Sequence, residues 1–331
     1  MPNGSISTRQ LGSSKLQVSE VGLGCWQLGG DFGPINEDTA TEILEQAVQE
    51  GITFFDTADV YGAGQSESYL GHTLTKIAPD AVIATKYGRG DCSYPNSYSF
   101  NNLRDSVLRS QDRLQRNCLD LLQLHCISQA ELEKEAIFDW LREVQQQGHI
   151  AHFGASVETL EEAHICTAQE DLASLQIIFN LMRQRPLMDL FDEAKEKDVG
   201  IIVRLPLASG MLSGKFNKNT SFDKSDHRNF NKDGEAFSVG ETFSGIEFNK
   251  GLELVKKLET YKPAHLDMAG FAMRWILDHD AVSSIIPGAS SPKQVSQNAA
   301  VGQAQRLDSA LHDKLYQLYL NDIEPAIRCK I

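Results

Sequence analysis

The amino-acid sequence predicts an α/β fold: a (β/α)8 TIM barrel with an N-terminal hairpin and a long loop after the seventh strand. Short apolar runs alternate with amphipathic helical segments, which is typical of βα repeats around a parallel sheet. The chain has eight such runs, and eight strands close a barrel of this kind. No linker divides the 331 residues, so we expect one barrel domain over residues 1–331. The expected strands are Val21–Cys25, Ile52–Phe55, Ala81–Thr85, Leu119–Leu124, His152–Ala155, Leu175–Phe179, Gly200–Leu205 and Ser284–Ile286.

The segments between these runs predict helices that pack on the outside of the barrel. In Asp38–Glu50, for example, Ile43, Leu44 and Ala47 lie on one stripe, and Gly51 supplies the stop. The first twenty residues indicate a short hairpin with its turn near residues 11–14. The expected helices are Asp38–Glu50, Leu103–Leu114, Leu132–Gln147, Met188–Lys197, one that begins near Pro292, and Asp308–Asn321.

The composition excludes some classes of function. The net charge is −14, which argues against a nucleic-acid surface because such surfaces need basic patches. The chain has neither an N-terminal signal pattern nor an apolar run of the roughly 18 residues that a membrane span needs. These observations indicate a cytoplasmic protein that contacts neither nucleic acid nor membrane, and they leave the oligomeric state open.

Six cysteines are scattered along the chain, and no two of them form a C-x-x-C pair. This spacing suggests neither a zinc site nor a redox motif, so we expect no bound metal and free thiols in a reducing compartment. Cys126 follows His125 directly, and alternation along a strand predicts that its side chain faces outward. The six are Cys25, Cys92, Cys118, Cys126, Cys166 and Cys329.

Four residues at or just after strand ends are the candidate catalytic groups: Asp56, Tyr61, Lys86 and His125. In a β/α barrel these ends converge on one rim, where active sites are built. Taken singly, each residue type at a strand end more often has a structural role. Together they predict a site that donates a proton to a carbonyl oxygen.

The chemistry of the four groups supports this interpretation. A free phenol has a pKa of about 10, so at neutral pH it can act as an acid. An adjacent ammonium group favours the phenolate and would lower the pKa of Tyr61, while Asp56 would keep Lys86 charged and in place. His125 could donate a hydrogen bond to the substrate oxygen, which would stabilise the negative charge that develops there.

At this point the chain resembles the aldo-keto reductase family, from about Leu11 to about Ala300. Each motif alone would be weak, but their order and spacing together are specific. The motifs are Gly51–Gly62 (GITFFDTADVYG), Ser66-Glu67, Leu70-Gly71, Ala84–Lys86 (ATK), Leu119–His125 (LDLLQLH), Phe153–Ser156 (FGAS), Pro206–Lys215 (PLASGMLSGK) and Ile286–Ser290 (IPGAS).

The resemblance implies reduction of a small carbonyl substrate, an aldehyde or ketone, by NADPH. It implies that Tyr61 is the acid, that Lys86 and Asp56 tune it, and that His125 orients the carbonyl. Two alternatives stay open. One is a nucleotide-sensing subunit with little turnover, since the β-subunits of potassium channels resemble the same family. The other is a sugar or alcohol dehydrogenase that runs in the oxidative direction with NAD(P)+.

A Rossmann site is not suggested, because no G-x-G-x-x-G opens a βαβ unit. The resemblance implies instead that the dinucleotide binds across the barrel rim. Ser156 and Gln176 would meet the nicotinamide carboxamide, and Ser213, Gly214 and Lys215 the pyrophosphate. The adenosine end would meet Gly288, Ser290, Gln294 and Asn298. Further candidate cofactor contacts are Trp26, Asp56, Arg204, Pro206 and Leu207.

Three positions depart from the family pattern. Val157 stands where many relatives have an asparagine, and Arg204 where many have an aromatic ring under the nicotinamide, although a guanidinium could stack there instead. Ser290 stands where some relatives hold the 2′-phosphate of NADP with a cation, and Lys293 is the nearest substitute. Losing such a charge-assisted bond costs about 1.5–3 kcal/mol. NADPH is therefore the expected cofactor, with NADH possible.

Loops should set the substrate. Trp26 is expected at the pocket mouth or as a structural aromatic. Tyr87 and the loop Gly88–Phe100, with Arg89, are expected either to line the pocket or to be exposed to solvent. The segment Phe216–Phe248 is rich in polar residues with interspersed phenylalanines, and it follows strand seven. It is expected to be either a mobile cofactor lid or a plain flexible insertion. Aldehydes, ketones and sugar carbonyls all remain open.

Overall fold

A computed structural model describes residues 6–30, 32–90, 93–224 and 226–330. Within these residues, eight parallel strands form one sheet in the order β10-β9-β8-β7-β6-β5-β4-β3. The sheet closes where β3 meets β10, because Val21 bridges Ile285 and Gly24 bridges Gly288. The strands are β3 Leu23–Gly24, β4 Phe54–Asp56, β5 Val82–Tyr87, β6 Leu119–His125, β7 Ile150–Ser156, β8 Leu172–Ile178, β9 Gly200–Arg204 and β10 Val282–Ile285.

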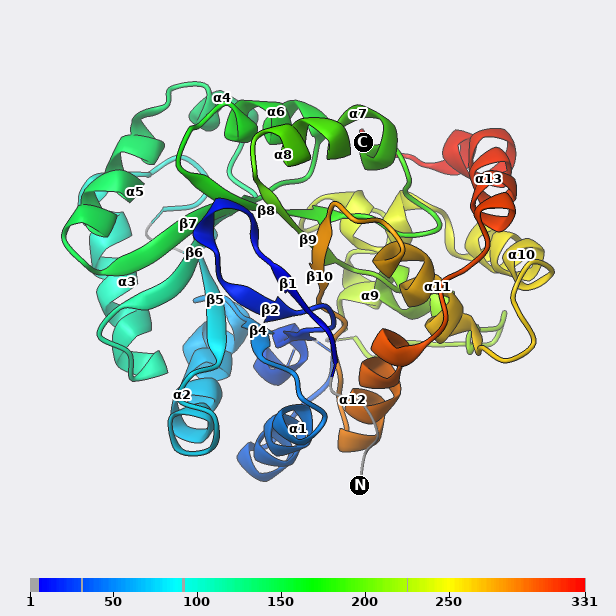
Figure 1. The fold of residues 1–331 in the computed structure, drawn as a ribbon, viewed down its shortest axis with the longest axis horizontal. Coiled ribbons are helices and arrows are strands. Elements are labelled where there is room, and N and C mark those ends of the chain that lie inside the picture. Colours follow the sequence, from blue (N-terminus) through cyan, green and yellow to red (C-terminus); the bar gives the residue numbers. More distant parts are fainter. Residues whose placement is uncertain (1–5, 31, 91–92, 225, 331) are drawn as a thin grey trace.

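The predicted barrel is thus confirmed, with strand ends that differ from the predicted ones by a few residues. The N-terminal hairpin is also present: β1 (Thr8–Gln10) pairs antiparallel with β2 (Gln17–Ser19) and lies across the end of the barrel that faces the viewer in Figure 1. A 3₁₀ turn over Gly12–Ser14 connects its two strands. The active-site candidates lie at the opposite, carboxyl ends of the strands.

Helices surround the barrel (Figure 1). Their bounds are α1 Glu37–Gln49, α2 Gln65–Ile77, α3 Phe100–Leu114, α4 Gln129–Leu132, α5 Ala136–Gln146, α6 Leu160–Thr167, α7 Pro186–Asp189, α8 Phe191–Glu196, α9 His227–Phe230, α10 Phe248–Glu259, α11 Met268–Leu277, α12 Pro292–Ala299 and α13 Ser309–Leu318.

Three predicted helices are wrong in part. The one expected over Leu132–Gln147 begins only at Ala136, because Glu135 has φ +60, a left-handed conformation that a helix cannot continue through, and Leu132 instead ends the separate helix α4. The one expected over Met188–Lys197 is broken at Leu190, whose φ of −132 is extended beyond the helical range. The helix predicted to end at Asn321 leaves the α conformation at Tyr319, where a π-helical turn begins.

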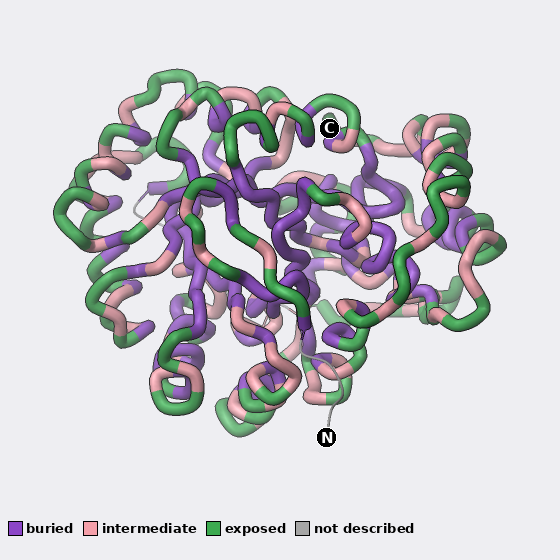
Figure 2. Tube along the Cα trace, in the orientation of Figure 1, coloured by how far each residue is buried: buried purple, intermediate pink, exposed green. Residues whose placement is uncertain are grey.

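The apolar core has two layers. One apolar cluster fills the inside of the barrel and contains Phe54, Ala84, Leu121 and Ile202. Leu11 of the hairpin turn packs against this cluster from the end of the barrel that the hairpin covers. The larger layer lies between the strands and the surrounding helices. Figure 2 shows this arrangement, with buried strands at the centre and exposed segments on the outer faces of the helices. The packed interior fixes the strand ends, so side chains on the rim have a rigid support.

The segment between the turn Ala208–Ser213 and α10 folds against the rim and contains, among its described residues, the short helix α9 and two 3₁₀ turns, Val239–Glu241 and Phe243–Gly245. Three hydrogen bonds attach it: Ser209 Oγ donates to the backbone oxygen of Glu241 (2.8 Å), Asn180 Nδ2 donates to Ser244 Oγ (3.1 Å), and Arg89 Nη2 donates to Glu241 Oε1 (2.9 Å). The segment therefore forms part of the wall above the strand ends.

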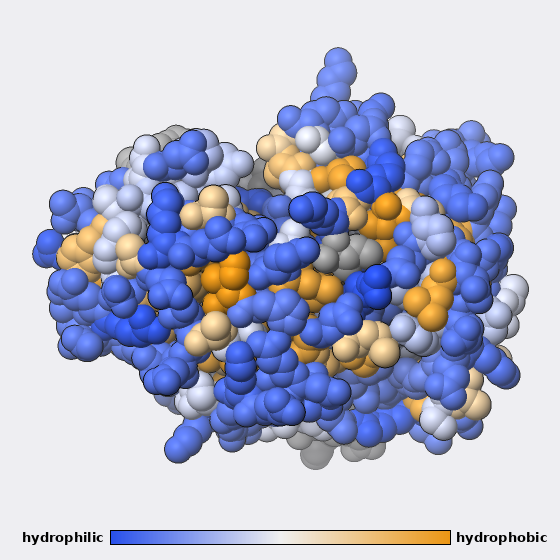
Figure 3. Space-filling view, turned by 90° about the horizontal axis from the view of Figure 1, so that it is seen from above, coloured by the Kyte–Doolittle hydropathy of each residue, from blue (hydrophilic) through white to orange (hydrophobic). Residues whose placement is uncertain are grey.

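The face in Figure 3 is mostly hydrophilic, with small apolar areas between the polar ones. Among the described residues, none of the helices combines the length and the apolar character that crossing a membrane requires.

Candidate active site

A buried polar network occupies the carboxyl ends of β4, β5, β6 and β8. Lys86 Nζ lies 2.5 Å from Asp56 Oδ1 and donates to the backbone oxygen of Thr57 at 2.7 Å. Gln123 Nε2 and Gln176 Nε2 both donate to Asp56 Oδ2, at 2.9 and 2.7 Å. The parallel register produces this grouping, since it pairs Lys86 with Gln123 across β5 and β6. Protein groups thus provide the hydrogen bonds of the buried Asp56 carboxylate and Lys86 ammonium.

Tyr61 lies directly above this network, in the turn Tyr61–Gly64 that follows β4. Lys86 Nζ is 3.4 Å from Tyr61 Oη and 5.0 Å from the centre of the ring. The next residue, Gly62, has φ +59, and a Cβ there would lie 2.7 Å from the backbone oxygen of Gly29. Glycine therefore permits the close approach of two turns that holds the phenol in place.

Opposing effects set the pKa of Tyr61. Burial raises the pKa of Tyr61 to about 12 and outweighs the Lys86 ammonium, which lowers it. For Lys86 itself, burial lowers the pKa, but Asp56 and Tyr61 raise it more, so the net shift is upward. Lys86 thus lowers the pKa of Tyr61, as expected from the sequence, but burial, which the sequence does not reveal, gives a net rise in the free protein. At neutral pH the phenol is protonated and the ammonium charged.

His125 ends β6, and its ring packs edge-on against the Tyr61 ring at a centroid distance of 5.9 Å. Burial, followed by the charges of Arg89 and Lys86, holds the pKa of His125 well below its ordinary value. The imidazole is therefore neutral at pH 7. Nδ1 of His125 is buried and has no hydrogen-bond partner among the described residues, while the residue lines the cleft described below.

A cleft of about 590 Å³ opens over these side chains. Asp56, Tyr61 and His125 line it, while Lys86 lies behind them, buried below the surface. Of the candidate cofactor contacts, all but Gly214 line the same cleft; Gly214 ends the turn Ala208–Ser213 with φ +71. The lining candidates are Trp26, Asp56, Ser156, Gln176, Arg204, Pro206, Leu207, Ser213, Lys215, Gly288, Ser290, Gln294 and Asn298.

Polar groups that could meet a dinucleotide line the cleft. At one end, Ser156 Oγ donates to Gln176 Oε1 at 3.3 Å, beside Asp56. At the other end, Ser290 donates to Gln294 Oε1 from both its backbone nitrogen (2.8 Å) and its hydroxyl (3.1 Å). Ser291 caps the N-terminus of α12, and such helix ends favour anions. Lys293 is exposed and does not line the cleft.

Cys126 points into the cleft, so the expectation that it faces outward is wrong. It lies one residue beyond the end of β6 and has φ +49, and strand alternation therefore no longer applies. Its Sγ lies 3.7 Å from Ser156 Oγ and 3.7 Å from Arg204 Nη2. The Arg204 guanidinium also donates to the backbone oxygen of Val157 at 3.1 Å, which fixes the guanidinium plane at the rim.

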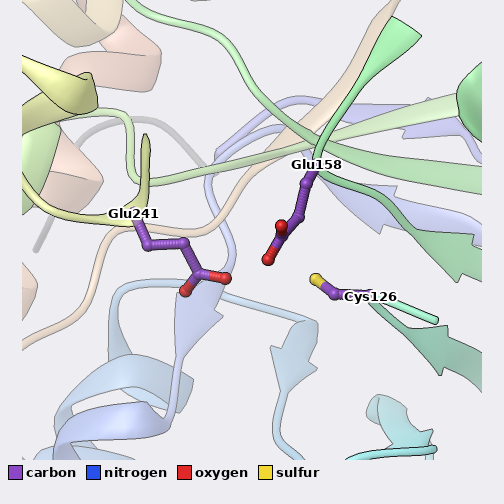
Figure 4. Close-up of side chains that lie close together, drawn as sticks. All are labelled: Cys126, Glu158 and Glu241. Carbon is purple, nitrogen blue, oxygen red and sulfur yellow. The ribbon is translucent and has the colours of Figure 1, made fainter. Parts of the chain in front are cut away.

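Figure 4 shows Cys126, Glu158 and Glu241 pointing toward a common centre, and their ligand atoms lie within 4.8 Å of one another. Two guanidinium groups already balance the carboxylates. Arg89 Nη2 donates to Glu158 Oε1 at 2.7 Å and to Glu241 Oε1 at 2.9 Å, and Arg204 Nη1 lies 3.6 Å from Glu241 Oε2. We therefore assign the cluster to ion pairing, and the absence of a metal stays a prediction.

Burial and the neighbouring Glu241 carboxylate raise the pKa of Glu158 to about 7. Glu241 behaves in the opposite way: burial alone would raise its pKa, but Arg89 and Arg204 hold it at about 2. One carboxylate of the cluster is thus ionised throughout the neutral range, and the other can exchange a proton near pH 7.

Sequence reasoning missed several residues that complete the site. Gln123 bonds Asp56, and Glu241, Phe32 and Phe237 form cleft walls. Gln123 could have been found, because it is a polar residue at an inward position two residues before His125. The other three come from loops, and no local pattern in the sequence places them.

Comparison with known proteins is consistent with this geometry. The model of the "Aldo/keto reductase family" matches residues 20–319. The uncharacterized oxidoreductase YqkF of Bacillus subtilis is 29% identical over 303 residues, which cover 90% of this chain and 92% of that protein. L-galactose dehydrogenase of Arabidopsis thaliana is 32% identical over 219 residues, covering 63% and 67% respectively.

Solved structures share the fold over nearly the whole chain. Glycerol dehydrogenase AKR11B4 from Gluconobacter oxydans is 26% identical with a TM-score of 0.78, and 99% of each chain is covered. An aldo-keto reductase from Klebsiella pneumoniae in complex with NADPH has a TM-score of 0.69 at 19% identity, covering 99% of this chain and 98% of that one.

Proposed function

The chain belongs to the aldo/keto reductase family of oxidoreductases, and we propose that it reduces an aldehyde or ketone with a nicotinamide cofactor, using Tyr61 as the proton donor. The observation that supports this best is the buried chain Tyr61–Lys86–Asp56 beneath the cleft. It places a protonated phenol, backed by a fixed positive charge, at the cleft surface.

The protein groups have distinct roles in this reaction. Tyr61 gives its phenolic proton to the carbonyl oxygen while the carbonyl carbon receives a hydride, so the product is an alcohol. Lys86 stabilises the phenolate that remains, and Asp56 keeps Lys86 charged and in place. His125, which is neutral, holds the carbonyl oxygen by a hydrogen bond, because a neutral imidazole can donate from one nitrogen.

The proposed cofactor is NADPH, with NADH as the alternative, and when bound it supplies the hydride. Ser156 and Gln176 would hold the nicotinamide carboxamide, and Ser213 and Lys215 the pyrophosphate. Ser290, Gln294 and Asn298 would meet the adenosine end. Residue 288 leaves no room for a side chain, because a Cβ there would lie 2.0 Å from the side chain of Gln27. Gln27 itself lines the cleft next to Gly288.

A second candidate is oxidation of a hydroxylated substrate, since two relatives bear the names glycerol dehydrogenase and L-galactose dehydrogenase. Oxidation would need Tyr61 as a base. A pKa of about 12 keeps the phenol protonated at neutral pH, which favours reduction in the free protein. A nucleotide-sensing subunit is the third candidate, and it would bind cofactor without appreciable turnover. A cytoplasmic location and a single barrel domain complete the proposal.

The test is the loss of reduced-nicotinamide absorbance when purified protein is mixed with a reactive aromatic aldehyde, with NADPH and NADH run side by side. Turnover supports the reductase. Tight cofactor binding without turnover would favour the sensing subunit, and faster oxidation of alcohols than reduction of carbonyls at pH 7 would favour the dehydrogenase.

A further inference from the structure

The wall of the cleft next to Tyr61 and His125 combines aromatic rings with an ion pair. The ring of Trp26 is stacked on that of Tyr61, with centroids 5.9 Å apart and planes 20° apart. Phe237 meets Trp26 at 6.2 Å, and the Arg89 guanidinium lies 5.9 Å from the centre of the Phe237 ring. These contacts form a continuous wall around the place where a carbonyl would meet Tyr61.

The ion pair in this wall joins two loops. Arg89 follows β5, and Glu241 belongs to the 3₁₀ turn Val239–Glu241. Both line the cleft; the Glu241 side chain is 5% exposed and that of Arg89 20%. The two hydrogen bonds that Arg89 donates to carboxylates use Nη2, and a guanidinium has three further N–H groups on its other nitrogens. The pair therefore keeps capacity to bind a ligand.

We propose that the substrate is a neutral carbonyl compound with hydroxyl groups on the neighbouring carbons, and that Arg89 and Glu241 determine this specificity by binding those hydroxyls. The inference rests on the proposed function and names the substrate class for the same site. A hydroxyl group both donates and accepts hydrogen bonds. It can donate to the Glu241 carboxylate and accept from the Arg89 guanidinium, while Trp26 and Phe237 contact the carbon skeleton.

The same wall disfavours the two other classes of carbonyl. A carboxylate substrate at Arg89 would face the ionised Glu241 and the partly ionised Glu158, and like charges at this distance repel. An aliphatic aldehyde would leave the charged groups without partners after water is displaced. Sites built to bind a substrate hydroxyl reject analogues that lack it, by about 10⁴- to 10⁵-fold in the strongest cases.

The experiment compares D-glyceraldehyde with propanal, which has the same carbon chain without hydroxyls, and with 4-nitrobenzaldehyde as a reactive aldehyde. kcat/KM is measured with NADPH for wild type, Glu241→Gln and Arg89→Gln. For each substrate the wild-type value is divided by the variant value, which cancels differences in hydration and reactivity between aldehydes. We expect both variants to lose about 10- to 100-fold with glyceraldehyde and less than about threefold with the other two.

A matched control separates specificity from loop placement. Glu235→Gln makes the same exchange at an exposed position of the same segment, and it should change neither the melting temperature nor any ratio. Glyoxylate gives a second readout: kcat/KM for this anion should rise in Glu241→Gln, because Arg89 loses one of its two carboxylates. This gain cannot come from a misplaced loop.

Equal losses for all three aldehydes, with no gain for glyoxylate, would show that the pair only positions the loop, and the inference would be overturned. The inference would also be overturned if wild type reduces 4-nitrobenzaldehyde but the ratio of wild-type to variant kcat/KM for glyceraldehyde stays close to one. If wild type turns over none of the carbonyls, the proposed function fails and the substrate class fails with it.

Discussion

Lys86 Nζ lies 2.5 Å from an oxygen of Asp56 and 3.4 Å from the phenolic oxygen of Tyr61, so one buried ammonium joins the carboxylate to the proposed acid. The side chain of Lys86 is 1% exposed and that of Asp56 4%. Such a pair is costly to bury but even more costly to break, because the remaining charge stays buried without its partner.

Lys86→Met should therefore lower the free energy of unfolding by about 3–5 kcal/mol, as measured by urea denaturation. The double variant Asp56→Asn/Lys86→Met should recover part of this loss because it removes both charges. Lys257→Met is the control: its pair with Asp322 has both side chains more than one third exposed, and it should cost less than about 1 kcal/mol. A cost for Lys86→Met as small as that of the control would contradict the network.

Neither Tyr61 nor His125 should change its protonation between pH 6 and 9, so neither should produce an inflection in the pH profile of carbonyl reduction. Tyr61 loses its proton only as the pH rises through about 12, and His125 gains one only well below its ordinary pKa. Glu158, which accepts a hydrogen bond of 2.7 Å from the cleft residue Arg89, has a pKa of about 7 and titrates in this range. We expect any inflection of kcat/KM near pH 7 to disappear in Glu158→Gln; an inflection that persists there would contradict the assignment to Glu158.

His227 should make the protein acid-sensitive. Its side chain is completely buried against Trp26 and Phe32, at centroid distances of 4.8 and 4.6 Å. Burial lowers the pKa of His227 from 6.5 to about 4. Between these values the unfolded chain binds a proton that the folded chain does not, so this contribution to stability is full above pH 6.5 and declines as the pH falls toward 4.

The expected loss is about 3 kcal/mol between pH 7 and pH 4, since one pKa unit corresponds to about 1.4 kcal/mol. His227→Phe keeps an aromatic ring in the cluster and should remove this part of the pH dependence. Urea denaturation at both pH values measures it for wild type and variant. Parallel decreases in the two proteins would assign the acid sensitivity to other groups, such as the half-buried His279, whose pKa partial burial lowers to about 4.

The cofactor preference should respond to a cation at residue 290. Ser290→Arg is expected to improve the affinity for NADPH over NADH by roughly tenfold, because it adds a charge-assisted bond to the 2′-phosphate. Lys293→Gln tests whether that lysine already supplies the cation; since Lys293 is exposed outside the cleft, the NADPH-to-NADH ratio should not change. Fluorescence titration of both cofactors measures the ratio, and an unchanged ratio in Ser290→Arg would place the phosphate elsewhere.

The barrel could be predicted from sequence because each strand is a short apolar run, and several of these runs end in a polar residue that the parallel register brings to the rim. Asp56, Lys86 and His125 are of this kind, and the structure groups them with Tyr61. The helices were harder to predict: α2 (Gln65–Ile77) carries buried polar residues such as Ser66, Glu67 and Thr73, so its apolar stripe is incomplete.

Tertiary effects account for the remaining differences. The outward orientation predicted for Cys126 fails because the backbone turns to positive φ where the strand ends. The net pKa of Tyr61 could not be predicted, because the burial that outweighs the lowering by Lys86 cannot be read from its neighbours in sequence. Glu241 and Arg89 are 152 positions apart in the chain, and only the folded loop brings their side chains into contact.

The central claim is that Tyr61 supplies the proton, and Tyr61→Phe tests it most directly. The measurement is NADPH oxidation with 4-nitrobenzaldehyde, alongside cofactor affinity by fluorescence titration. Removing a general acid costs about 10²–10⁴-fold in rate, so we predict a loss of that size in kcat, with NADPH affinity within about twofold of wild type because the phenyl ring keeps its packing on Trp26. A variant that retains full carbonyl reduction would contradict the account.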